Sequence, residues 1–149
     1  KKFKGLKYRQ EIIFQSKKLT IINDSKATTF SSSVSLLSSL SNVYWIVGGQ
    51  AKKGDKLLLS KKNCKNFKAY IFGTNQNFFI SKIEKLMNYE SFFDLKNIIK
   101  KLSLEIQKDK EIVHKTILFS PSAASFDNFK NFEKRGEYFN QLVKKYIND

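Results

Sequence analysis

The sequence predicts an α/β domain, a three-layer sandwich whose mostly parallel sheet opens with an antiparallel strand or hairpin and carries helices on both faces. Three observations lead to this fold class. Short apolar runs that end in glycine or in a polar turn recur along the chain. Segments with apolar residues at helical spacing separate these runs. No internal repeat or low-complexity linker divides the 149 residues, so we expect a single core.

The N-terminal part predicts a strand pair followed by a helix. The apolar stretches 8–14 and 19–23 flank a polar turn, as in a hairpin. The serine-rich segment 29–40 has its apolar residues near helical spacing, with Thr28 and Thr29 as candidate caps. Serine is a mediocre helix former, so packing has to supply much of this helix's stability.

The middle of the chain alternates strands and helices. The apolar run 43–47 ends at two glycines, as a buried parallel strand would, and a loop leads from it to a short helix near 57–61. A second apolar strand at 67–72 is closed by Gly73, and the spacing predicts a helix over 76–87.

The C-terminal third continues the pattern. A helix is predicted from a cap at Asp94 to about residue 108, because its apolar residues follow i, i+3, i+4 spacing. Residues 117–119 form the centre of another buried strand, and the loop 120–127 precedes a last helix with one apolar side.

Composition restricts the classes of function. The net charge of +15 raises nucleic acid as a partner, but only Arg9 and Arg135 are arginines and the lysines are spread along the whole chain. No apolar run approaches the roughly 20 residues of a bilayer span, and Cys64 has no disulfide partner. We therefore expect a cytoplasmic protein without a membrane or nucleic-acid partner. The chain opens without Met and reads as a piece of a longer protein.

Three loops are candidates for chemistry, because ligands bind beyond the carboxyl ends of parallel strands. The loop 23–29 places a carboxylate, a lysine and hydroxyls before a helix, where they serve either an anion or simple capping. The loop 48–55 combines glycines with two lysines, and the loop 120–132 combines small and hydroxyl residues with a helix start. Each loop alone is compatible with a purely structural role.

Other sites find less support. His114 has no Cys, His or Asp pattern near it and is expected to be a surface or packing residue. Ser120 lies outside any GxSxG elbow, so a serine triad is not indicated. A stand-alone dinucleotide-binding domain is disfavoured by the missing GxGxxG fingerprint, and a basic nucleic-acid-binding module remains the main alternative.

Taken together, the three loops resemble the C-terminal domain of the Mur ligase family, in its D-glutamate-adding branch. The resemblance is carried by Phe3-Lys4-Gly5-Leu6-Lys7-Tyr8-Arg9-Gln10-Glu11, Asn23-Asp24-Ser25-Lys26-Ala27-Thr28, Gly48-Gly49 with Lys52, Ser120-Pro121, and Ala124-Ser125-Phe126-Asp127 through Asn131-Phe132-Glu133-Lys134-Arg135-Gly136. It spans almost the whole chain. Its specificity lies in the strings at 23–28 and 120–136, because ligases of the family that add other amino acids carry different motifs there. Tyr8, Thr29 and Asn128 stand where the family usually has His, Asn and Gln.

The resemblance implies a Rossmann-like domain of a peptidoglycan-synthesising ligase, which adds D-glutamate to UDP-N-acetylmuramoyl-L-alanine through an acyl phosphate. Lys26 would face the transferring phosphate as the catalytic residue and would also bind nucleotide. The residues implied for D-glutamate are Thr28, Lys52, Ser125, Phe126 and Phe132, and those implied for the nucleotide are Arg9, Asp24 and Lys26.

The resemblance also implies what residues 1–149, as one domain, would not supply. ATP and Mg²⁺ would be bound mainly by a central domain, with no metal held by this chain, and the UDP substrate by an N-terminal domain. Both of those domains are absent from this sequence, so the chain alone is expected to be inactive, and the protein is expected to be a monomer.

Overall fold

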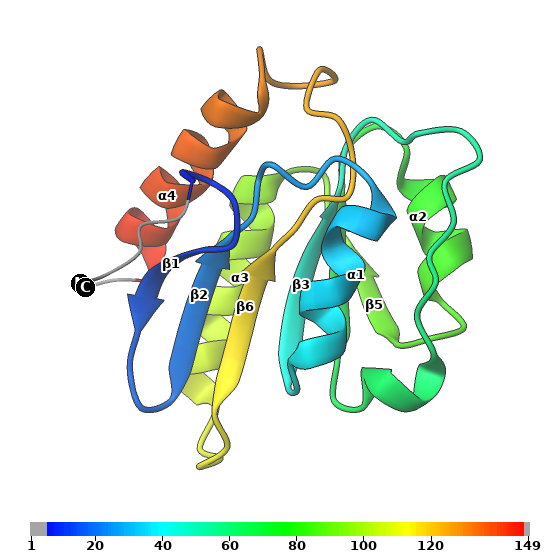
Figure 1. The fold of residues 1–149 in the computed structure, drawn as a ribbon. Helices are drawn as coiled ribbons and strands as arrows, with labels where there is room; N and C mark the ends of the chain where they lie inside the picture. The colour runs from blue at the N-terminus through cyan, green and yellow to red at the C-terminus, as the bar shows by residue number, and fades with distance from the viewer. Residues whose placement is uncertain (1–5, 148–149) are drawn as a thin grey trace.

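The computed structural model describes residues 6–147, which form one six-stranded sheet of order β1-β2-β6-β3-β4-β5 (Figure 1). The strands are β1 (Glu11–Gln15), β2 (Leu19–Asn23), β3 (Val43–Gly48), β4 (Lys68–Phe72), β5 (Asn88–Ser91) and β6 (Lys115–Phe119). The helices are α1 (Phe30–Ser39), α2 (Gln76–Ile83), α3 (Leu95–Lys108) and α4 (Phe132–Tyr146), with a 3-10 helix η1 (Lys61–Cys64). β1 pairs antiparallel with β2 and the other pairings are parallel, which confirms the predicted Rossmann-like α/β sandwich.

Two apolar cores lie on opposite faces of the sheet. Along β3, Trp45 points to the core formed with α1 and α2, and Ile46 points to the core formed with α3 and α4. Figure 1 shows α1 in front of the sheet and α3 behind it. Because β3 is buried on both faces, its sequence is continuously apolar instead of alternating.

The structure corrects the expected elements in two places. Residues 57–60 are not helical, and the short helix forms later, as η1. The helix expected over 76–87 ends at Ile83, and a turn over residues 84–87 leads into the strand β5. The strand β5 was not predicted from the sequence, because this four-residue edge strand is polar and pairs only with β4.

The N-terminal hairpin is confirmed, but its first strand begins at Glu11. Tyr8 and Gln10 have φ values of 65° and 49°, which no strand accommodates. The first part of the family-like opening segment, Phe3 to Gly5, lies outside the described residues. None of the helices within residues 6–147 is long and apolar enough to cross a membrane.

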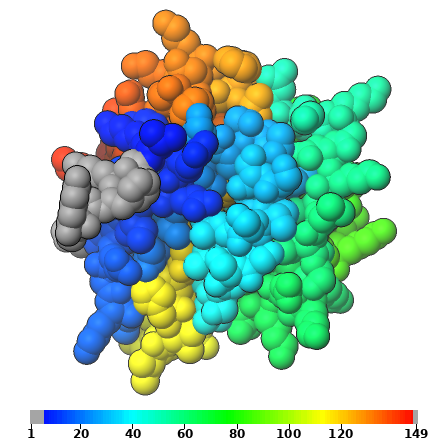
Figure 2. Space-filling view, in the orientation of Figure 1, coloured from blue at the N-terminus to red at the C-terminus, as the bar shows by residue number. Residues whose placement is uncertain are grey.

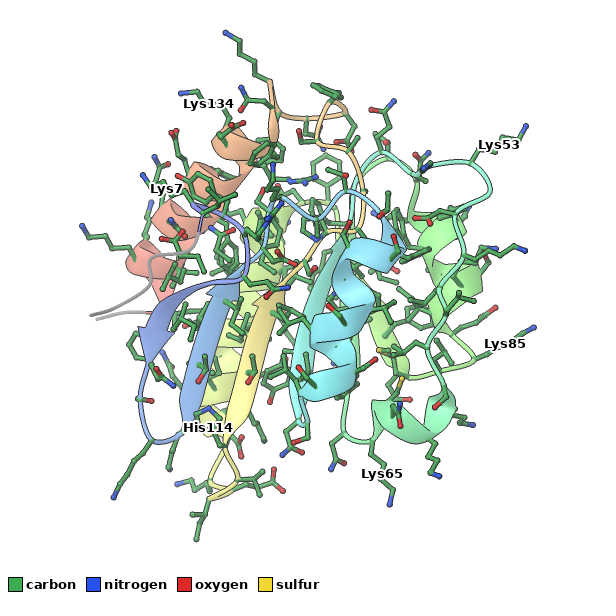
Figure 3. All side chains as sticks on the ribbon, in the orientation of Figure 1. Lys7, Lys53, Lys65, Lys85, His114 and Lys134 are labelled. Atoms are coloured by element: carbon green, nitrogen blue, oxygen red, sulfur yellow. The ribbon has the colours of Figure 1, made fainter. Side chains whose placement is uncertain are left out.

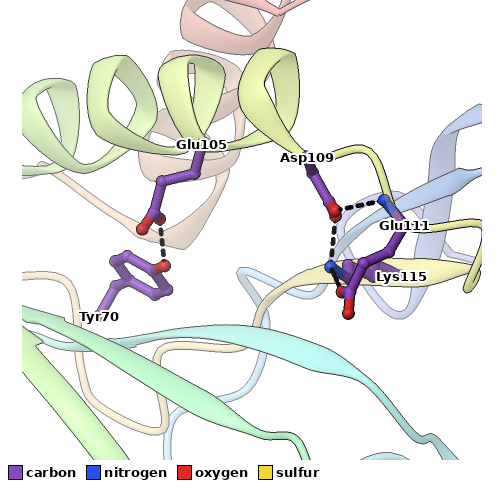
Figure 4. Close-up of polar contacts among 5 residues, drawn as sticks. All are labelled: Tyr70, Glu105, Asp109, Glu111 and Lys115. Atoms are coloured by element: carbon purple, nitrogen blue, oxygen red, sulfur yellow. Dashed lines mark hydrogen bonds and ion pairs between the residues drawn. The ribbon is translucent and has the colours of Figure 1, made fainter.

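Polar contacts fasten α3 to the sheet far from the predicted loops (Figure 4). The hydroxyl group of Tyr70 donates a hydrogen bond to Glu105 of α3. Lys115 contacts Asp109 and lies 2.8 Å from a carboxylate oxygen of Glu111. These contacts anchor the carboxyl end of α3 to β4 and β6. The predicted loops lie at the other end of the strands, beyond their carboxyl ends.

Candidate functional site

The loops after β2, β3 and β6 meet beyond the carboxyl ends of the strands, at the top of Figure 1. The amide of Asp24 donates to the carbonyl of Phe119 at 2.7 Å, which ties the first loop to the end of β6. Gln50 and Ala124 exchange two backbone hydrogen bonds of 3.1 Å, which tie the second loop to the third. The predicted gathering of these three loops is therefore present.

A fourth loop, residues 73–75 after β4, joins this group and was not selected from the sequence. The amide of Ala51 donates to the side-chain oxygen of Asn75 at 2.8 Å. Asp127 accepts from the hydroxyl of Thr74 at 3.3 Å, so Asp127 links loops and does not cap the last helix. The cap of α4 is Asn131, whose side chain accepts from the amide of Lys134.

Close packing explains the glycines of the second loop. Gly48 has a φ of 138°, and a Cβ there would lie 2.0 Å from the carbonyl oxygen of Phe72. Gly49 has a φ of 128°, and a Cβ there would lie 3.0 Å from the carbonyl oxygen of Ala124. Glycine is required at both positions by conformation and by space, so these residues serve the packing of the loops.

One cavity of about 580 Å³ opens where the first loop faces the N-terminal segment and α4. Its lining residues are Arg9, Gln10, Asp24, Lys26, Ala27, Thr28, Ser32 and Phe132. Figure 2 shows the N-terminal residues (dark blue) beside the segment that leads into α1 (mid-blue) and below the loop that leads into α4 (orange). Segments distant in the sequence thus contribute to one site.

Lys26 is positioned by contacts with the N-terminal segment and with the start of α4. Its amide donates to the carbonyl of Tyr8 at 2.9 Å, and the hydroxyl of the preceding residue, Ser25, donates to the carbonyl of Phe132 at 2.7 Å. The ammonium group of Lys26 lies 4.5 Å from the centre of the Phe132 ring. A cation over an aromatic face is held by the ring quadrupole, so the charge is directed toward the cavity wall.

Arg135 is a site residue that sequence reasoning did not propose. It is 1% exposed, and its guanidinium group donates to Ser25 and, at 2.9 Å, to the carbonyl of Ala123. Burial lowers the pKa of Arg135 to about 10, so the group remains charged at neutral pH. A fixed positive charge therefore lies beneath the first and third loops. A signal for it existed, because Arg135 is one of only two arginines in a chain that otherwise uses lysine.

Two backbone amides at the amino end of α1 are already hydrogen-bonded to capping side chains. The side chain of Thr29 accepts from the amide of Ser32 at 3.3 Å, and Asp55 accepts from the amide of Phe30 at 2.8 Å. The capping role weighed for the first loop is thus taken by Thr29, together with Asp55 from the second loop. Thr28 is exposed and lines the cavity, which leaves its hydroxyl group available to a ligand.

Asp24 is nearly buried at the cavity wall, with 3% exposure. One carboxylate oxygen accepts from the amide of Gln10 at 3.0 Å, and the other accepts from the hydroxyl of Ser120 at 2.7 Å. Burial raises the pKa of Asp24, and the two hydrogen bonds and the charge of Arg9 oppose that rise. Each oxygen retains a further lone pair for a ligand.

The remaining predicted residues do not line this cavity. Lys52 is exposed on the second loop and is not among the lining residues. Ser125 is 3% exposed, and its carbonyl accepts from the amide of Phe129 at 2.8 Å. Phe126 is 71% exposed.

Several lysines of the described part of the chain lie far from one another on its surface. Figure 3 shows Lys7, Lys53, Lys65, Lys85 and Lys134 pointing outward from different parts of the molecule. His114 is exposed and lies 2.8 Å from both the hydroxyl of Thr20 and the carbonyl of Lys17, as a packing histidine would. Within residues 6–147, no group of three or more His, Cys, Asp or Glu residues could hold a metal ion.

Similarity in sequence to known proteins extends over nearly the whole chain. A "UDP-N-acetylmuramoylalanine--D-glutamate ligase" of Wolbachia sp. subsp. Brugia malayi is 39% identical over 145 residues, which are 97% of this chain and 29% of that protein. The ligase of the same name from Francisella philomiragia is 39% identical over 147 residues, covering 96% of this chain and 34% of that protein. The chain belongs to the Mur ligase family. It spans about a third of the length of the curated relatives that it matches.

Two further comparisons add little to this Mur ligase assignment. The chain matches no protein-family model. Among solved structures, the MurF ligase of Thermotoga maritima in complex with ADP is 17% identical, with 96% of this chain and 33% of that one covered and a TM-score of 0.43. That TM-score is too low to carry a conclusion about the site.

Proposed function

We propose that this chain is the C-terminal domain of an ATP-dependent ligase that adds D-glutamate to UDP-N-acetylmuramoyl-L-alanine in peptidoglycan synthesis. The observation that carries the proposal is the cavity itself. It combines Lys26, Arg9 and Asp24 with Thr28 in a chain that is 39% identical to ligases of this name. Two cations and a hydroxyl beside an acceptor carboxylate suit a phosphorylated ligand.

Lys26 is the proposed catalytic residue. Its amide donates to the carbonyl of Tyr8, and its ammonium group lies 4.5 Å from the centre of the Phe132 ring, so its charge would need little reorganisation when a phosphoryl group transfers. Arg9 and Asp24 are the proposed nucleotide contacts. Arg9 offers a planar set of donors to phosphate, and Asp24 offers acceptor lone pairs to a hydroxyl or amino group.

D-Glutamate is the proposed amino-acid substrate. Thr28 and Phe132 already line the cavity, and Phe132 would contribute its backbone amide. Lys52 forms no ion pair within residues 6–147, so its ammonium group is available to a carboxylate. Ser125 would add a hydroxyl donor and the exposed Phe126 an apolar wall.

The rest of the reaction requires other domains. ATP and Mg²⁺ would be bound mainly by a central domain, and the UDP-linked substrate by an N-terminal one. The proposed protein is a cytoplasmic monomer, without membrane or nucleic-acid partners. Closure of this domain over a nucleotide held elsewhere would complete the site, as in other enzymes that assemble on closure.

The deciding experiment assays the complete polypeptide that carries this domain. Phosphate release is measured with ATP and UDP-N-acetylmuramoyl-L-alanine, in the presence of D-glutamate and, separately, L-glutamate. The proposal predicts that phosphate is released only with D-glutamate and that the amide product forms at the same time. Equal release with L-glutamate, or none with either enantiomer, overturns it.

The assignment of Lys52 has a matched control in its neighbour Lys53, which is also exposed on the same loop. Lys52→Ala should raise the KM for D-glutamate at least about tenfold, because a hydrogen bond between charged groups contributes about 1.5 kcal/mol or more. Lys53→Ala should leave this KM unchanged. Equal KM values in the two variants would show that Lys52 does not bind the substrate.

A further inference from the structure

A chain of buried hydroxyl groups ends on Asp24. The hydroxyl of Ser33, in α1, lies 2.5 Å from that of Ser120 and 2.7 Å from that of Ser122. Ser120 in turn donates to the Asp24 carboxylate at 2.7 Å. All four side chains are at most 3% exposed, so protein groups and not bulk water satisfy them.

An ionised Asp24 sets the direction of the hydrogen bonds from Ser120 and Ser33. A carboxylate only accepts, so the single proton of Ser120 is committed to Asp24. The oxygen of Ser120 then accepts the proton of Ser33. The hydroxyl of Ser122 has two acceptors, the Ser33 hydroxyl at 2.7 Å and the carbonyl of Ser120 at 3.3 Å, and the shorter contact is the one to Ser33. Hydrogen bonds aligned in this way polarise one another, which strengthens the bond to the carboxylate.

Ser33 occupies a position that packing alone would give to an apolar residue. It lies on the buried face of α1 between Phe30 and Leu37, and all three are 0% exposed. An alanine there would bury as readily and favours helix more strongly. The hydroxyl group is therefore explained by its contacts with Ser120 and Ser122 and not by the core.

We propose that Ser33 is a positioning residue that acts through Ser120 to orient the Asp24 carboxylate as an ionised acceptor at the cavity wall. This inference rests on the proposed function, in which Asp24 receives a hydroxyl or amino group of the nucleotide. The backbone that carries the hydroxyl groups is also held in place, because Trp45 donates from its indole nitrogen to the carbonyl of Ser120 at 2.9 Å. Asp24 is thus fixed from the β6 side as well as by Gln10.

The charged groups around Asp24 favour the same ionised form. Arg9 and Lys26 line the same cavity, and Arg9 acts to lower the pKa of the carboxyl group. Burial acts in the opposite direction and is the stronger effect, so the pKa of Asp24 is raised overall. Loss of one hydroxyl donor should therefore move the ionisation of Asp24 further toward neutral pH.

The first test is a carboxyl-carbon NMR titration of Asp24 in the protein and in three serine-to-alanine variants. Ser120→Ala should raise the pKa most, by about one unit, and Ser33→Ala by less, with Ser122→Ala least. Ser35→Ala, at an exposed position of the same helix, should leave it unchanged. No change in Ser33→Ala, or a change equal to that of Ser35→Ala, overturns the proposal.

The second test measures the KM for ATP against pH in the complete polypeptide. In Ser33→Ala the rise of KM at acid pH should begin at a higher pH than in the parent, and Ser33→Thr, which keeps a hydroxyl group, should restore part of the profile. A KM raised equally at every pH would indicate a merely structural serine and overturn the positioning role. If the ligase activity itself is absent, the titration still decides the hydroxyl chain, so the two failures are distinguishable.

Discussion

The guanidinium group of Arg135 donates to Ser25 twice, from Nη2 to the carbonyl oxygen at 2.6 Å and from Nε to the hydroxyl oxygen at 3.0 Å. This pair of bonds joins α4 to the loop that carries Lys26, across more than a hundred residues of sequence. Ser25 in turn donates to the carbonyl of Phe132. The site lysine therefore follows a residue whose position is set by the last helix.

Replacement of Arg135 by lysine should be strongly destabilising. Lysine retains a charge but not the planar set of donors, so Ser25 and Ala123 cannot both be reached and a buried ammonium group is left poorly paired. We expect a loss of about 3 kcal/mol in the free energy of unfolding, measured by chemical denaturation. Lys134→Ala, at the adjacent exposed position, should change it little. Similar stability of the two variants would contradict the role given to Arg135.

The layers of the fold and the loops of the site were predictable, because both depend on patterns local in the sequence. Continuous apolar runs marked β3, β4 and β6, and strand-to-helix transitions marked the loops. The cavity residues Lys26 and Thr28 lie on one such loop. A short polar edge strand such as β5 carries no comparable pattern.

Buried polar contacts between distant segments were not predictable in the same way. Ser33 and Ser120 are 87 positions apart, and nothing in the local sequence of either indicates the other. Likewise the sequence showed Arg135 only as part of a motif and did not indicate that its guanidinium group binds Ser25 and Ala123. Such contacts depend on the completed sheet, which brings the start of α1, the carboxyl end of β6 and the start of α4 together.

Gly48→Ala should disrupt the second loop. The added Cβ would meet the carbonyl oxygen of Phe72 at 2.0 Å, at a φ of 138° that L side chains rarely adopt. We expect a loss of at least about 3 kcal/mol in unfolding free energy. Gly54→Ala separates the two causes, because Gly54 also has a positive φ, of 83°, but no heavy atom within 4 Å of the added carbon. Its cost should be about 1 kcal/mol, and equal costs would refute the steric account.

Tyr70 makes stability sensitive to alkaline pH. Burial raises the pKa of Tyr70 well above its ordinary value, and the hydrogen bond to Glu105 raises it further. The unfolded chain binds fewer protons than the folded one once the pH exceeds about 10, so the free energy of unfolding falls as pH rises from there. This contribution is fully present below pH 10 and decreases throughout the window up to the folded-state pKa.

The check is denaturation of Tyr70→Phe between pH 8 and about 11.5. The variant keeps the ring but has no hydroxyl group to titrate, so its stability should fall less steeply above pH 10 than that of the parent. Near neutral pH it should be less stable by about 1 kcal/mol, the net contribution of one hydrogen bond. Parallel curves for the two proteins across the alkaline range would contradict the shifted tyrosine.

Lys26→Gln should separate catalysis from stability. Lys26 is half-buried at the cavity and forms no salt bridge within residues 6–147, so its loss should leave the unfolding midpoint nearly unchanged. In the complete polypeptide, kcat should fall at least about a hundredfold, because a preorganised charge beside the transferring phosphoryl group would be removed. Lys7→Gln is the matched control. Lys7 also lies over an aromatic ring, at 5.7 Å from the centre of Tyr8, but does not line the cavity. A comparable fall in kcat for both variants would mean that general surface charge, and not the position of Lys26, supports the reaction.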